Sequence, residues 1–204
     1  LGITCNGFMA PDQVLRKQGM RPGERLILTK PIGTGTLFAA EMRLKSHGKD
    51  MERAVEHLLV DIEEAANILR AHDASACTDV TGFGLLGHLL EMANPSKVGI
   101  QLDLESIPTL AGAKSTAAAG ILSSIHTQNR MASEGILNPA EFVSHPTYPL
   151  LFDPQTSGGL LASVPEDQAE ACMDQLKRAG YASAACIGEV VGQTEDQGRP
   201  VLLR

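Results

Sequence analysis

The sequence contains no tryptophan, and only two tyrosines and five phenylalanines stand among its 204 residues. Its core must therefore be built from aliphatic side chains, alanine and methionine, which suits alanine-rich helices packed on a sheet. No apolar run approaches the roughly 18 residues of a membrane-spanning helix, so we expect no membrane partner. Hydrophobic residues make up 43% and charged residues 20% of the chain, near the averages of globular proteins, which argues against general disorder.

An excess of positive charge is also lacking. Seventeen lysines and arginines stand against 24 aspartates and glutamates, which gives a formal net charge of −7. An acidic chain without a basic stripe is a poor ligand for nucleic acid or anionic membranes, so we expect neither partner. We expect any phosphate ligand to be held by metal ions, by helix N-termini or by a basic partner domain.

Cysteines are few, and no two of them have the C-x-x-C spacing. They are Cys5, Cys77, Cys172 and Cys186. A chain of this size has no need of disulfides, so we predict reduced thiols in a cytoplasmic protein. We expect the last three to be small buried hydrophobic residues and Cys5, near the chain end, to be exposed.

Strand and helix patterns alternate along the chain. We expect strands at 25–29, 74–80, 98–104, 159–164 and 184–191, an edge strand at 200–203, and helices at 36–46, 50–72, 85–92, 110–119 and 167–180. The least regular segment is 121–148, where short helices are expected at 129–135 and 139–144. The fold class predicted is α+β, a mixed sheet with helices packed on one or both faces.

The most regular helical pattern runs from Asp50 to His72. Its apolar residues recur at steps of three and four: Val55, Leu58, Leu59, Ile62, Ala65, Ala66 and Leu69. This spacing predicts one continuous helix of more than 20 residues. The helix at 85–92 is expected to be closed by Asn94 and Pro95.

A carboxylate, Asp79, stands at the end of a predicted strand and is followed by a turn, Thr81 to Gly84, and a helix. Ligands of α/β sheets gather at the carboxyl ends of strands, and a helix N-terminus offers free N–H groups to phosphate. An aspartate there repels phosphate unless a cation intervenes, and Mg²⁺ favours one or two carboxylates plus phosphate oxygens. The alternative is that Asp79 only caps the helix and the glycines only make a turn.

Two further stretches combine small polar residues with glycines. The segment from Asp153 to Gly159 (DPQTSGG) lies between apolar runs, and its paired glycines allow close approach of a ligand or of another strand. The segment from Pro31 to Thr36 follows a strand and loosely resembles a phosphate loop, but it lacks the spacings of the established nucleotide motifs. Each stretch also fits a tight connection without any ligand.

Three of these stretches, 28–35, 79–89 and 151–161, resemble the signature stretches of selenophosphate synthetases (selenide, water dikinases) and occur in the same order. The sequence is similar to the C-terminal domain of that family over essentially its whole length. The family shares a superfamily with aminoimidazole ribonucleotide synthetase. The resemblance implies the α+β fold of that superfamily and an ATP-dependent phosphotransferase that makes selenophosphate from selenide, ATP and water, with release of AMP and phosphate.

The resemblance also implies a division of labour. Residues 1–12 would be the remnant of the last strand of an N-terminal domain and 13–204 the C-terminal domain. The family's nucleophile, its essential lysine and most of its metal ligands lie in the N-terminal domain, so we expect no catalytic residue here and no activity of the chain alone. Asp79 would bind Mg²⁺, and Thr81, Gly82 and Gly84 would contact ATP, the substrate held between the domains. The N-terminal domain, selenide and a second copy in a homodimer are the expected partners.

One segment departs from the family pattern. Members commonly carry Pro-Gly-Gly-Thr-x-x-Asn after the alanine-rich helix, whereas this chain has the sequence Ser123 to Asn129 (SSIHTQN), which keeps only the asparagine. This leaves a ligand role for that loop open. Two other hypotheses also stay open: a related ATP enzyme of purine or thiamine synthesis or of hydrogenase maturation, and a non-catalytic dimerisation or docking module.

Overall fold

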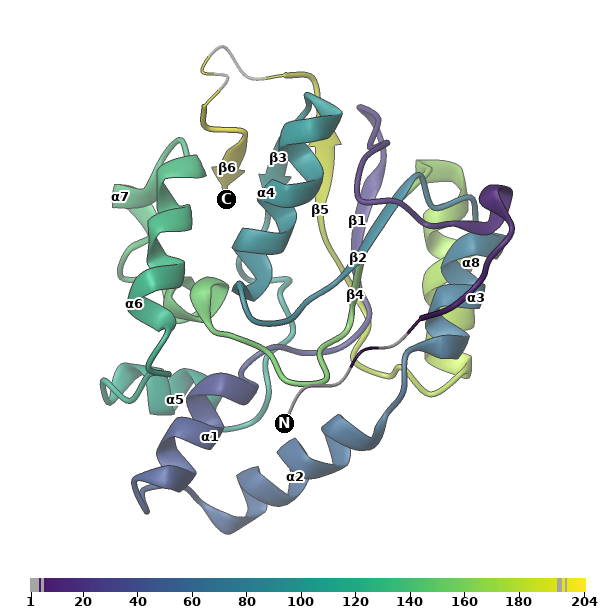
Figure 1. The fold of residues 1–204 in the computed structure, drawn as a ribbon. Helices are drawn as coiled ribbons and strands as arrows, with labels where there is room; N and C mark the ends of the chain where they lie inside the picture. The colour runs from purple at the N-terminus through teal and green to yellow at the C-terminus, as the bar shows by residue number, and fades with distance from the viewer. Residues whose placement is uncertain (1–3, 5, 194–195, 197) are drawn as a thin grey trace.

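A single mixed sheet organises the molecule. The structure, a computed structural model, describes residues 4, 6–193, 196 and 198–204 (Figure 1). The strands are β1 (Arg25–Leu28), β2 (Ala76–Asp79), β3 (Gly99–Leu102), β4 (Leu160–Val164), β5 (Ala185–Val191) and β6 (Val201–Leu203). Their order is β2-β4-β1-β5-β3-β6, with the β3–β6 pair parallel and the other four pairs antiparallel. The predicted α+β fold class is confirmed.

Helices cover both faces of this sheet. Successive side chains of β1 point to opposite faces, and Leu26, Ile27 and Leu28 are therefore all buried. Leu26 and Leu28 of β1 belong to one core cluster, and Ile27 between them belongs to the other. The smaller cluster joins the sheet to α3 (Glu63–Ala71) and α8 (Glu166–Arg178). The larger one lies under α4 (Gly84–Ser96), on the opposite face (Figure 1).

The remaining helices are α1 (Thr34–Met42), α2 (Gly48–Leu59), α5 (Ala113–Ala118), α6 (His126–Asn129) and α7 (Pro139–Phe142), with 3₁₀ helices η1 (Pro11–Gln13), η2 (Arg130–Gly135) and η3 (Tyr148–Phe152). The α-helices among them, η2 and η3 lie around the larger core, whereas η1 lies beside α3, where Gln13 and Arg70 line the same hollow. The short helices expected in the irregular segment 121–148 are therefore present. In the described residues, no helix has the length and apolar character needed to span a membrane.

The single helix predicted over 50–72 is wrong. Helix α2 ends at Leu59 and α3 begins at Glu63, with Val60 in an extended conformation between them (φ −73°, ψ 113°). The buried Lys30 ammonium donates to the Val60 carbonyl at 2.7 Å, and the Asp61 carboxylate accepts the Glu63 N–H at 3.1 Å. A tertiary contact therefore ends one helix and a side-chain cap begins the next.

The apolar spacing did not reveal this break because it continues through it. Leu59 is 81% exposed at the end of α2, whereas Leu69 of α3 is fully buried. A stripe that looks continuous in the sequence thus belongs to two helices with different surroundings.

The sequence predicted that Asn94 and Pro95 close α4, and that prediction is wrong. The helix continues through Pro95 to Ser96 and ends at Lys97, which has a left-handed conformation (φ 56°). The missing N–H of Pro95 removes one hydrogen bond within the last turn, where helices tolerate the loss more easily than in their middle.

The prediction of a strand remnant at the start of the chain falls partly outside the described residues, since Leu1–Ile3 and Cys5 are not described. No strand is assigned to Thr4 or to 6–10, and Phe8 is fully exposed. The segment that follows runs beside the sheet edge, where the Cys77 N–H donates to the Arg16 carbonyl at 2.8 Å. The proposed boundary between 1–12 and 13–204 stays a prediction.

Candidate functional site

Asp79 is the last residue of the edge strand β2. The three residues before it are buried, whereas Asp79 itself is exposed. Its carboxylate makes no ion pair within the described part of the chain. It lines a hollow of about 420 Å³ together with Lys17, Arg70 and Thr78. This carboxylate is therefore open to a ligand, and its role as a metal ligand stays a prediction.

The turn after Asp79 is built from the residues that the sequence singled out. The Gly84 N–H donates to the Thr81 carbonyl at 3.1 Å, and helix α4 begins at Gly84. Gly84 has a positive φ of 73°, and a Cβ there would lie 2.9 Å from the Leu151 carbonyl oxygen, which explains the glycine. Gly82 is exposed and Gly84 is buried. Gly82 is therefore open to a ligand, whereas Gly84 shapes the turn from inside.

A chain of polar side chains supports the same turn from α4. Thr81 Oγ1 is hydrogen-bonded to His88 Nε2 at 3.2 Å, and His88 Nδ1 is 3.1 Å from a carboxylate oxygen of Glu91. Lys17 Nζ donates to the same Glu91 carboxylate at 2.7 Å. Lys17, hydrogen-bonded to Glu91, lowers the pKa of that carboxyl. The series links the Thr81 hydroxyl to a lysine that lines the Asp79 hollow.

Asn129 joins the Asp79 turn to the second glycine-containing stretch. Its side-chain Nδ2 donates to the Gly82 carbonyl at 2.8 Å and to the Phe152 carbonyl at 3.0 Å. Asn129, the one residue of this segment that matches the family pattern, thus braces two parts of the fold. That match was the only sign of its importance in the sequence, and it did not indicate which groups Asn129 would bind.

The stretch from Asp153 to Gly159 packs directly against the Asp79 turn. The Gln155 N–H donates to the Thr81 carbonyl at 2.9 Å, and the Val80 N–H donates to the Gly159 carbonyl at 2.9 Å. A Cβ on Gly158 would lie 2.0 Å from the Val80 carbonyl oxygen. The paired glycines therefore permit close approach of the neighbouring strand end, which was one of the two roles that the sequence left open.

Asp153 lies in the interior and is not a free ligand. It is fully buried, and its carboxylate accepts a hydrogen bond from Thr36 Oγ1 at 2.8 Å and another from Gln155 Nε2 at 3.0 Å. Burial raises the pKa of this carboxyl, and the two hydrogen bonds oppose that rise. Asp153 thus holds the stretch in place.

The loose phosphate-loop pattern at Pro31–Thr36 has an internal function as well. The side-chain carbonyl of Gln155 accepts the Gly33 N–H at 2.9 Å and the Thr34 N–H at 3.2 Å. These are first N–H groups of α1, which a phosphate would otherwise bind. Gln155 occupies them, so this helix start is capped by the protein itself.

Lys30 ties the same region to helix α2. Its residue is 2% exposed, and its Nζ donates to the carbonyls of Val60 at 2.7 Å and Ser157 at 2.6 Å. Burial lowers the pKa of Lys30, and the nearby Asp61 carboxylate opposes this effect. Nothing in the sequence pattern marked Lys30 as more than part of the third stretch.

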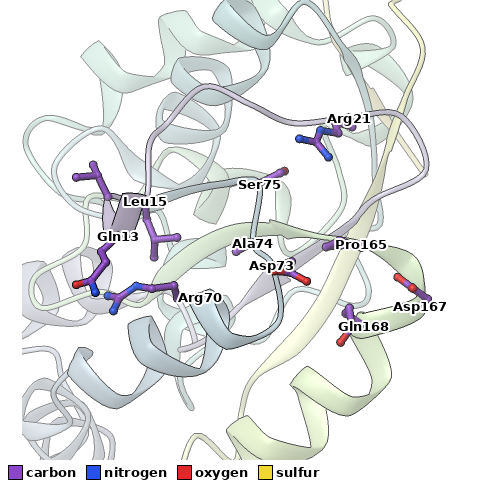
Figure 2. A pocket seen from close by; sticks show the side chains of 11 residues that line it. Gln13, Leu15, Arg21, Arg70, Asp73, Ala74, Ser75, Pro165, Asp167 and Gln168 are labelled. Atoms are coloured by element: carbon purple, nitrogen blue, oxygen red, sulfur yellow. The ribbon is translucent and has the colours of Figure 1, made fainter. Parts of the chain in front are cut away.

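A larger hollow, of about 570 Å³, adjoins the Asp79 hollow through Arg70, which lines both. Figure 2 shows Arg21 and Arg70 well apart around it, with Asp73 just after the end of α3 and Asp167 in the first turn of α8. Its charges are mixed, and the two guanidinium groups do not converge on one point. None of the residues predicted as metal or nucleotide ligands lies in this hollow.

The cysteines and acidic residues limit the other chemistry in the described part of the chain. Cys77 and Cys172 are buried free thiols, and burial raises their pKa to about 12 and about 11. Cys186 is a free exposed thiol, which corrects its predicted burial, and Cys5 is not described. Across 4, 6–193, 196 and 198–204, no three histidine, cysteine, aspartate or glutamate side chains gather where they could hold a metal ion.

Comparison with known proteins agrees with this architecture. Residues 21–199 match the family described as AIR synthase related protein, C-terminal domain. Selenide, water dikinase 2 of Peptoclostridium acidaminophilum is 38% identical over 198 residues, which cover 95% of this chain and 56% of the relative. Selenide, water dikinase of Desulfitobacterium hafniense (strain Y51) is 38% identical over 203 residues, which cover 100% of this chain and 58% of the relative. The chain thus spans about half the length of the curated relatives it matches.

Solved structures with a similar fold are more distant in sequence. The hydrogenase maturation protein HypE in complex with ATP is 17% identical, with a TM-score of 0.69 over 96% of this chain and 51% of that one. Thiamine-monophosphate kinase from Stenotrophomonas maltophilia K279a is 18% identical, with a TM-score of 0.64 over 94% of this chain and 53% of that one. At these identities the likeness concerns the fold alone.

Proposed function

The chain belongs to the family of AIR synthase related C-terminal domains, and from this premise we propose that it serves as the C-terminal domain of a selenide, water dikinase. The complete enzyme would form selenophosphate from selenide, ATP and water, with release of AMP and phosphate. The observation that carries the proposal is the free Asp79 carboxylate at the end of β2, in a chain 38% identical to relatives that bear this name.

Asp79 is suited to hold Mg²⁺ against a nucleotide. It is exposed, unpaired among the described residues and at the rim of an open hollow. A single protein carboxylate is a fitting contribution, because Mg²⁺ is usually bound by one or two carboxylates together with phosphate oxygens and water. When bound, the ion would neutralise and position the phosphate oxygens, as phosphoryl transfer requires.

The turn beside Asp79 would orient the nucleotide. Thr81 and the exposed Gly82 are nearest in sequence to the carboxylate, and their carbonyls are already fixed by Gln155 and Asn129. Gly84 would act by shaping the turn, since it is buried against the segment from Leu151 to Asp153. A rigid turn places the ligand groups without a cost of ordering them on binding.

The remaining catalytic groups would come from an N-terminal domain. Among the described residues, the lining of that hollow contains no second carboxylate and no exposed cysteine. We therefore propose that this chain alone lacks dikinase activity. We further propose that the complete protein works in the cytoplasm as a homodimer, with no nucleic acid or membrane as partner.

The test joins this chain to the N-terminal half of the Peptoclostridium acidaminophilum relative and follows products by ³¹P NMR. The proposal predicts selenophosphate and AMP from ATP only when selenide is present, and no product from this chain alone. The alternative, an enzyme of thiamine synthesis, predicts ATP consumption with thiamine monophosphate and none with selenide. A folded chimera that binds ATP and shows this second pattern would refute the proposal.

A further inference from the structure

A separate hollow of about 260 Å³ lies between α2, the end of β1 and the loop after α8. Its ionisable lining residues include Lys30, Arg53, Glu56 and His57, and the loop contributes Gly180–Ser183. It shares no lining residue with the hollow that contains Asp79. A ligand in this hollow would therefore bind apart from the proposed dikinase site.

One face of α2 forms a wall of this hollow. Arg53, Glu56 and His57 line it, and their spacings of three and four residues place them on the same side of the helix. Val60, the extended residue that follows α2, also lines the hollow. Its carbonyl accepts a hydrogen bond from Lys30 Nζ, which joins the end of α2 to the end of β1.

Positive charge predominates in the lining. Lys30 and Arg53 stand against one carboxylate, Glu56. Arg53 is exposed and has no carboxylate within ion-pair distance in the described part of the chain. The Lys30 ammonium uses two of its three N–H groups for the Val60 and Ser157 carbonyls, which leaves one donor.

His57 supplies a second observation, independent of the positive charge. It is only 9% exposed, and its Nε2 is buried without a hydrogen-bond partner among the described residues. Buried polar atoms without partners are rare in native proteins and often mark the place of a water or a ligand. Burial, and then the charge of Lys30, lowers the pKa of His57 to about 4. At neutral pH the ring is therefore uncharged and can donate one hydrogen bond from Nε2.

We propose that this hollow binds a small free oxyanion of the phosphate type. Its oxygens accept hydrogen bonds from the Arg53 guanidinium, the remaining N–H of Lys30 and the Nε2–H of His57. Arginine suits this role because its planar fork matches the oxygens of phosphate and carboxylate groups. The bound anion gives the buried Nε2 the partner that it lacks.

The experiment titrates the 204-residue chain with inorganic phosphate at constant ionic strength, by calorimetry and by ¹⁵N NMR of the histidine rings. The proposal predicts saturable binding that shifts the His57 ring resonances. Arg53→Gln raises the dissociation constant for phosphate about tenfold, because one charge-assisted contact is lost. Arg178→Gln, which removes an exposed arginine of α8 outside the hollow, leaves the constant unchanged.

Lys30 is a poor test position, since its substitution also breaks the link between Val60 and Ser157. Arg53 is exposed, so the Arg53→Gln protein is expected to fold normally, and circular dichroism checks this. Absence of saturation in the millimolar range would overturn the proposal, as would equal binding by Arg53→Gln or unmoved His57 resonances. Tighter binding of AMP than of inorganic phosphate would also overturn it, because the proposed site takes a free oxyanion.

Discussion

Asn129 bridges the carbonyl of Gly82, in the Asp79 turn, and that of Phe152, the last residue of η3. The Asp79 turn is therefore braced by a residue that lies outside it. A side-chain amide that satisfies two carbonyls is costly to remove, since both acceptors lose a partner at once.

Substitution of Asn129 by alanine is expected to lower the free energy of unfolding by about 1–2 kcal/mol, because two hydrogen bonds disappear. Urea denaturation measures the loss. Asn94→Ala is the matched control, since Asn94 is exposed on α4 and makes no side-chain hydrogen bond among the described residues. Equal stability of the two variants would show that Asn129 does not brace the turn.

His57 makes stability depend on pH in a defined direction. Its pKa in the folded protein is about 4, below the ordinary value of 6.5. Between these two pH values the ring is therefore protonated in the unfolded chain and neutral in the folded protein. The stability associated with His57 is therefore present above pH 6.5 and is lost as the pH falls toward 4.

Between these two values the natural chain is expected to lose on the order of 2 kcal/mol more stability than His57→Gln, which has no titrating ring. Urea denaturation at several pH values measures the difference. The raised pKa of Asp153 acts in the opposite direction but is common to both proteins, so it cancels. Parallel pH profiles of the two proteins would contradict the assignment.

The residues at this scale were only partly predictable. Asp79 was identifiable because a carboxylate between a buried strand and a glycine turn is a recognisable pattern, and the structure leaves it exposed. Lys30, Gln155 and Asn129 were not, because their long-range partners lie between 23 and 127 residues away in the chain. No local pattern encodes such pairings.

Among the elements, the connection between α2 and α3 shows most clearly where local pattern fails. The six strands and the main helices were foreseen from alternation and from three- and four-residue spacing. The break at Val60 was missed, because the apolar spacing passes through it while Lys30 and Asp61 supply the groups that cause it. Periodicity reports which face is apolar and not whether the backbone is continuous.

Asp61 caps the start of α3, so Asp61→Ala is expected to cost about 1 kcal/mol of stability through the lost bond to the Glu63 N–H. Thermal unfolding followed by circular dichroism measures this change. Glu64→Ala, an exposed change within the same first turn, is the control and is expected to have a much smaller effect. If Asp61→Ala unfolds at the temperature of the natural chain, the cap has no energetic role.

At the scale of the whole molecule, a six-stranded sheet with helices on both faces supports one candidate ligand-binding edge. One exposed carboxylate and a braced turn lie at the end of β2, and no cluster of three metal-binding side chains is present among the described residues. The order of the sheet and its mixed pairing could not be deduced from the sequence pattern, since strand order depends on long-range contacts. The resemblance of three stretches to one family predicted the α+β fold class, which the structure confirms.

The most direct test is the rate of selenide-dependent AMP formation by the chimera of this chain with the N-terminal half of its relative, before and after Asp79→Asn. The account predicts a fall of at least about 100-fold, as expected when a group that stabilises transition-state charge is removed. It also predicts unchanged stability, since Asp79 is exposed, and a normal rate for the control Asp73→Asn. A chimera that keeps its full rate after Asp79→Asn would contradict the assignment of Asp79 as a metal ligand.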